Sequence, residues 1–105
     1  MALDTNTLFD KMLAAGKGLA GGVWSQIQTF AIPELKKIAI QIEAIATSGF
    51  KPEAMKLLLK LQVDASVAII VAMTALTLQL VQDAINAILL AVRDFVNGAV
   101  GVPLI

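Results

Sequence analysis

Hydrophobic residues recur at helical spacing along the whole chain, and prolines and glycines divide the pattern into segments. In residues 6–31 the apolar positions repeat every three or four residues, which predicts an amphipathic helix beginning near Thr5 or Asn6. Four glycines between residues 16 and 22 weaken its middle, so we expect a bend or break there. A second helix is predicted over 33–48, beginning at Pro33, with a stripe formed by Leu35, Ile38, Ala39, Ile42, Ile45 and Ala46.

The third segment, residues 52–97, has no glycine and no proline after Pro52. It predicts one long hydrophobic helix of about 70 Å, unless it kinks, since each residue adds about 1.5 Å. The sequence therefore predicts an all-α fold in which a helical hairpin assembles as an oligomeric bundle. Its parts are an amphipathic region 1–50, the long helix within 51–98, and an apolar tail 99–105 that breaks the helix.

One side of the long helix carries small residues followed by polar residues, at alternating spacings of three and four. In lipid, such a seam lets helices approach closely and hydrogen-bond to one another. In water it would face solvent, while other helices cover the wider apolar arc. The predicted seam consists of Ala65, Ala68, Ala72, Ala75, Gln79, Gln82 and Asn86.

The stretch 65–82 contains eighteen residues without a charge, between Asp64 and Asp83. This length lies in the range of about 17–25 residues for a membrane span. Composition favours that interpretation, since 58% of residues are hydrophobic and only 15% are charged. Asp83 lies in apolar surroundings, and we interpret it either as a polar pore site or as an interfacial acid.

Charge is divided unevenly between the two halves of the chain. Residues 1–60 hold seven basic and five acidic residues, and residues 61–105 hold one basic and three acidic residues. If the chain enters a membrane, the lysine-rich N-terminal half is expected on the cytoplasmic or inner side. Lys51, Lys56 and Lys60 are candidates for contact with anionic lipid head groups, or form a solvated helix face. The acidic N-terminus does not resemble a signal peptide.

Other motifs have two interpretations each. The spacing of Ala14, Gly18 and Gly22 permits close helix packing or marks a hinge. Trp24 is either an anchor at the lipid interface or a core aromatic. "GKGLAG" at 16–21 matches a dinucleotide-loop pattern, but no strand pattern precedes it, as that site requires.

The side-chain inventory makes catalysis improbable. The chain has no His, Cys or Tyr, and its carboxylates are scattered, so we expect no enzyme activity, cofactor, metal site or small-molecule substrate. Zero net charge gives no reason to expect nucleic acid. The first predicted function is a self-assembling, membrane-embedded structural protein, such as a virion-membrane, holin-like or scaffold component, with copies of itself and a bilayer as partners. The alternatives are a soluble subunit of a filament, ribbon or shell, and a pore-forming peptide toxin.

Overall fold

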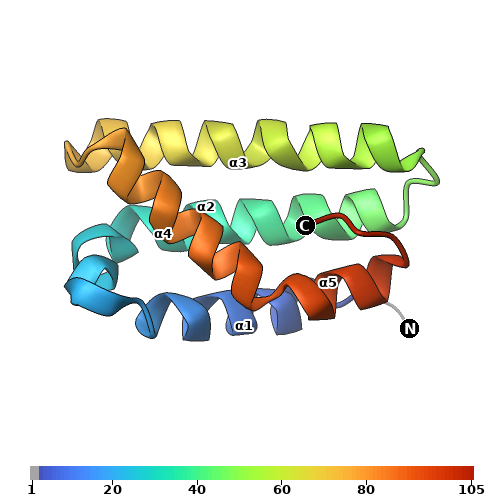
Figure 1. The fold of residues 1–105 in the computed structure, drawn as a ribbon, viewed down its shortest axis with the longest axis horizontal. Coiled ribbons are helices and arrows are strands. Elements are labelled where there is room, and N and C mark those ends of the chain that lie inside the picture. The colour runs from blue at the N-terminus through green and yellow to red at the C-terminus, as the bar shows by residue number, and fades with distance from the viewer. Residues whose placement is uncertain (1–2) are drawn as a thin grey trace.

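The computed structural model describes residues 3–105, and these residues form helices joined by short turns (Figure 1). The predicted all-α class is confirmed for this part of the chain. The elements are α1 (Thr5–Lys17), η1 (Ala20–Gly22, a short 3₁₀ turn), α2 (Val23–Ala46), α3 (Pro52–Thr74), α4 (Leu78–Ala91) and α5 (Arg93–Val100).

The first four α-helices enclose one hydrophobic core. α2 packs against α1 and α3, and α4 also packs against α3 and α1, so each of the four helices contacts two of the others around the core. Figure 1 shows α4 crossing obliquely over the others, with α5 continuing toward the end of the molecule where the N-terminus lies. The molecule measures 37 × 22 × 18 Å with a radius of gyration of 13.1 Å. That is about the value expected for a folded chain of this length.

The predicted break at the glycines is confirmed. α1 begins after Asp4, whose side chain accepts a hydrogen bond from the N–H of Asn6, so the cap is one residue before the predicted positions. The helix ends at Gly18, and Gly21 and Gly22 then adopt φ values of 77° and 68°. Glycine takes this left-handed conformation without steric cost, which allows α2 to reverse direction against α1.

The predicted helix boundary at Pro33 is wrong, because Pro33 lies inside α2, a continuous helix of 24 residues. Proline inside a helix removes one hydrogen bond and costs about 3 kcal/mol. Packing offsets this cost: Pro33 itself is exposed, while the buried face continues on both sides of it. That face is formed by Ile27, Ala31, Leu35, Ile38, Ile42 and Ile45.

The predicted single helix over 52–97 is also wrong, because residues 75–77 form a turn and α4 folds back. Ala75 adopts the left-handed conformation with φ 59° and ψ 17°, and its N–H donates to the carbonyl of Val71 at 3.0 Å. Thr77 then caps α4 by accepting a hydrogen bond from the N–H of Leu80 at 3.2 Å. A second interruption at Val92 separates α4 from α5. Folding back lets Val81, Ile85 and Ile88 enter the core, where each is fully buried.

The C-terminal segment also differs from its predicted boundary. Helix α5 passes through Gly98 and ends at Gly101, which has φ 88°. The last residues then fold back onto the same chain, where Leu104 is buried. The side chain of Asn97 holds them: its Oδ1 accepts from the N–H groups of Leu104 (2.9 Å) and Ile105 (3.0 Å), and its Nδ2 donates to the carbonyl of Ile105 (3.2 Å).

Candidate interaction surface

Helix α3 buries one side and leaves an apolar side exposed. The buried side consists of Met55, Leu59, Val63, Ser66, Val67 and Ile70. The opposite side, called the α3 face below, consists of Leu57, Leu61, Ala65, Ala68, Ile69, Ala72 and Met73. At 3.6 residues per turn these seven positions share an arc of roughly 160°. Its larger members are well exposed, with Leu57 at 57% and Met73 at 58%.

No charged residue lies within this arc. The four charged side chains of α3 lie beyond its edge, toward the cleft with α4, and they are Glu53, Lys56, Lys60 and Asp64. Lys60 and Asp64 form an ion pair at 2.7 Å. Such exposed pairs contribute little to stability, typically under about 1 kcal/mol. The α3 face is therefore bordered on one side by a strip of charged residues whose charges sum to zero.

Among the described residues, α3 is the one helix long and apolar enough to cross a bilayer by length and composition. The core helix of a soluble protein can pass the same test, but most of such a helix is buried inside its own chain. Here only 28% of the apolar window is buried. The hydrophobicity of α3 therefore exceeds what its own chain covers, which is the usual mark of a surface that contacts something else.

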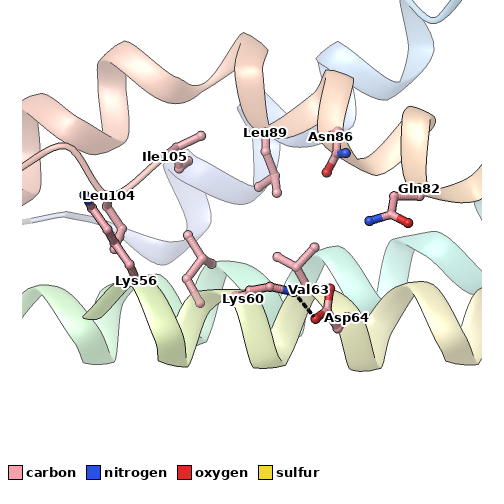
Figure 2. Close-up of a pocket in the computed structure, with 10 residues that line it drawn as sticks. Lys56, Lys60, Val63, Asp64, Gln82, Asn86, Leu89, Leu104 and Ile105 are labelled. Atoms are coloured by element: carbon pink, nitrogen blue, oxygen red, sulfur yellow. Dashed lines mark hydrogen bonds and ion pairs between the residues drawn. The ribbon is translucent and has the colours of Figure 1, made fainter. Parts of the chain in front are cut away.

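The predicted seam is divided by the turn at residues 75–77. Ala65, Ala68 and Ala72 lie together on the α3 face, and Ala75 is exposed in the turn. The polar members belong to α4: Gln79 is exposed at its start, while Gln82 and Asn86 turn toward α3 (Figure 2). The alanines and the amides are thus two separate features.

Gln82 and Asn86 border a cleft of about 280 Å³ between α3 and α4 (Figure 2). Lys56 and Lys60 lie on the opposite rim, and Leu104 and Ile105 close one end. The cleft exists because α4 diverges from α3 after the turn. Its interior is lined by Leu59, Val63 and Leu89.

Asp83 is exposed on α4 and accepts a hydrogen bond from Gln79 Nε2 at 2.7 Å. Within one chain it lines a shallow depression with Leu19, Ala20, Val23, Leu80 and Ala84. Arg93 contacts the neighbouring Asp94 at 3.4 Å. A pore lined by Asp83 stays a prediction about an assembly.

The predicted interface role of Trp24 does not agree with its position, since only 9% of the residue is exposed. Its ring packs against Gly16, where an added Cβ would lie 2.5 Å from a ring carbon. The predicted small-residue set lies across the break between α1 and α2, and a packing role for it stays a prediction. Ala14, Gly18 and Gly22 are exposed, and Gly16 is the glycine that permits a close approach. Sequence spacing gave no signal for this pair, because the glycine turn alone decides which ring meets which residue.

The three candidate lipid-contacting lysines are exposed. Lys51 precedes α3, and Lys56 and Lys60 lie in its first half. They occupy the end of α3 away from the turn, so the helix has a charged first half and an uncharged second half.

The acidic side chains of the described residues do not gather in one place. No group of three Asp or Glu side chains within 3–105 lies close enough to hold a metal ion. The pKa of Asp4 is lowered by a hydrogen bond from the Thr7 hydroxyl and another from the Asn6 N–H, which is helix capping. Glu34 is buried and pairs with the exposed Lys37 at 2.9 Å.

No family model, curated protein or solved structure matches this chain.

Proposed function

We propose that this protein is a non-enzymatic structural protein that binds a lipid bilayer and assembles with copies of itself. The observation that carries the proposal is the α3 face, an uncovered apolar surface along the one described helix that is long and apolar enough to cross a bilayer. Leaving such a face in water is unfavourable, at about 25 cal/mol for each Å² of apolar surface. Contact with acyl chains or with another copy removes that cost.

The alanines of the α3 face support self-assembly in addition to lipid binding. Ala65, Ala68 and Ala72 are separated by three and four residues and are all exposed. Small side chains at this spacing allow two helix backbones to approach closely, in lipid or in water. The same observation favours the second candidate function, a soluble subunit that polymerises into a filament, ribbon or shell.

The test is flotation of the purified chain with vesicles of phosphatidylcholine and phosphatidylglycerol, followed by a carbonate wash. The proposal expects the chain to float and to stay bound after the wash. The variant Leu61→Lys/Ile69→Lys places two charges on the α3 face and should lose binding. The control Ile40→Lys/Leu90→Lys adds the same charge at exposed apolar positions of α2 and α4 and should bind like the unmodified chain.

The two candidate functions differ in what happens without lipid. If the unmodified chain stays out of the vesicle fraction and sediments as large particles in detergent-free buffer, the polymer subunit is correct. If the control variant loses binding as strongly as the α3 variant, the surface responsible is not the α3 face.

A further inference from the structure

The charged residues of this protein are gathered toward one end of its long axis. The two longest stretches without a charge are residues 18–33 and 65–82. The first includes η1 and the beginning of α2, and the second includes the end of α3, the turn 75–77 and the beginning of α4. Together these stretches are called the uncharged end below.

The two stretches lie at the same end of the molecule although they are far apart in sequence. Figure 1 shows the α1–α2 connection and the α3–α4 turn at one end of the bundle. Leu19, Ala20 and Val23 of the first stretch line a depression with Leu80 of the second, and Asp83 and Ala84 complete its wall just beyond that stretch. The flanking charges Lys17 and Asp83 mark the border. The other charged side chains come from residues 4–11, 34–64 and 93–94.

The uncharged end is apolar on its α3–α4 side and polar on its α2 side. Ile69, Met73 and Leu78 are exposed around the turn, with Ala68, Ala72 and Ala75 between them. On α2 most of the exposed side chains are polar (Ser25, Gln26, Gln28 and Thr29), and the exposed apolar residues Ile32 and Pro33 lie at the far end of the stretch. Contact with an apolar medium would therefore begin at the α3–α4 turn, with the α2 side remaining nearer to water.

Four N–H groups of the turn and of the start of α4 are hydrogen-bonded internally. The N–H of Ala75 donates to Val71 O at 3.0 Å, and that of Leu76 donates to Thr74 Oγ1 at 3.3 Å. At the start of α4, the N–H groups of Leu80 and Val81 donate to Thr77. Internal hydrogen bonds of this kind lower the cost of moving a turn into lipid, where unsatisfied donors are expensive.

We infer that the uncharged end enters the bilayer with the α3–α4 turn leading, no deeper than one leaflet, while the bundle stays folded. This inference rests on the proposed function. The uncharged part of α3, Ala65–Thr74, is ten residues long and reaches about 15 Å. Half of a hydrocarbon core about 30 Å thick is also about 15 Å. One leaflet is therefore the upper limit that α3 sets. On α4 only Leu78–Gln82 precede Asp83, about 7.5 Å, so the turn stops short of that limit, with Asp83 near the head groups and the lysine-bearing half of the bundle in water.

Because the chain contains no cysteine, single cysteines can report depth. An environment-sensitive fluorophore is placed at Met73→Cys and Leu78→Cys, and at the controls Leu57→Cys and Phe50→Cys, which are exposed in the charged half. With the same phosphatidylcholine–phosphatidylglycerol vesicles, quenchers attached to acyl chains should quench the first two labels. A water-soluble quencher should reach the two controls.

A matched pair of charge substitutions tests the same point without a label. Met73 and Leu57 lie at the two edges of the α3 face and have nearly equal exposure, 58% and 57%. Met73→Lys should weaken vesicle binding by about tenfold or more, because a charge enters the hydrocarbon, and Leu57→Lys should change it less than about twofold. Circular dichroism of both variants checks that the helices are retained.

Two contrary outcomes are distinguishable. If the labels at residues 57 and 73 are equally deep, or both lysine variants weaken binding equally, α3 lies flat on the membrane. That overturns the insertion of the uncharged end and leaves the proposed function standing. If the unmodified chain does not bind vesicles at all, the proposed function fails and this inference fails with it.

Discussion

The six-membered ring of Trp24 lies on Gly16, so closely that a Cβ at Gly16 would be 2.5 Å from the ring carbon Cζ3. This contact joins the last turn of α1 to the first turn of α2 across the glycine connection. The rigid indole cannot bend away as a flexible side chain would. Any larger residue at position 16 must therefore shift one helix relative to the other.

Gly16→Ala should destabilise the protein. Overpacking of this kind costs typically about 1–3 kcal/mol, which outweighs a helix-propensity gain of up to about 1 kcal/mol. Urea unfolding followed by Trp24 fluorescence measures the difference directly. The control is Gly18→Ala, where the added Cβ meets only its own helix carbonyls at 3.5 Å and beyond. A Gly16→Ala variant as stable as Gly18→Ala would contradict the packing described here.

Ala75→Gly should stabilise the protein by about 0.5–1 kcal/mol, although glycine normally weakens helical proteins. An L-residue in the left-handed conformation costs about 1–2 kcal/mol, and glycine avoids most of that cost. Ala72→Gly, one turn earlier and inside α3, should instead destabilise it by about 1 kcal/mol. Thermal or urea unfolding of the two variants compares the signs. If both variants lose stability equally, the helix continues through residue 75.

Ala72→Leu tests self-assembly separately from folding. Ala72 is exposed on the α3 face, so a larger side chain should leave the unfolding midpoint of the single chain unchanged. It should reduce assembly in membranes, because it forces apart helices that meet at the alanines. Cross-linking in vesicles or sedimentation measures the oligomer. The control is Ala44→Leu, which adds the same atoms to an exposed position of α2. Normal assembly of Ala72→Leu would place the contact elsewhere.

Asn97→Ala should release the C-terminal residues. It removes three hydrogen bonds to the backbone of Leu104 and Ile105, each worth about 0.5–1.5 kcal/mol. The amides of residues 104 and 105 should exchange hydrogen faster, and stability should fall. Gln26→Ala, at an exposed position of α2 away from the C-terminal residues, is the control and should leave that exchange unchanged. Equal exchange in both variants would show that Leu104 packing alone holds the tail.

The cap at Asp4 should make the start of α1 sensitive to acid. Hydrogen bonds from Thr7 and Asn6 favour the carboxylate and lower the pKa of Asp4 below its ordinary value of 3.8. The cap contributes stability above the pKa of the unfolded chain, and this is lost as the pH falls through the lowered pKa of the folded state. The unfolding midpoints of the unmodified chain and Asp4→Ala should therefore differ near neutral pH and converge as the pH falls through the lowered pKa of Asp4. A difference that persists in acid would contradict the cap.

The sequence identified the residues of the candidate surface but not how the chain arranges them in space. The uncharged run 65–82 and the common side of Ala65, Ala68 and Ala72 follow from residue type and helical spacing. The run does not form one straight span, because the turn at residues 75–77 divides it into two arms. The sequence does not show that residues 18–33 and 65–82 lie at the same end of the molecule. That position depends on how the α1–α2 hairpin aligns with the α3–α4 hairpin.

By itself the sequence determined the helical class, the break at the glycines, the start of α3 at Pro52 and the buried stripe of α2 from Leu35 to Ile45. Each of these follows from local rules on backbone conformation and periodicity. Tertiary structure decided that α2 passes through Pro33, that the chain reverses at Ala75 and that Trp24 rests on Gly16. The proline inside α2 and the left-handed alanine each cost free energy locally, and no sequence pattern indicates the contact of Trp24 with Gly16. They persist because α2 and α4 bury apolar side chains against the other helices, and this burial outweighs the cost of a proline or of a left-handed alanine.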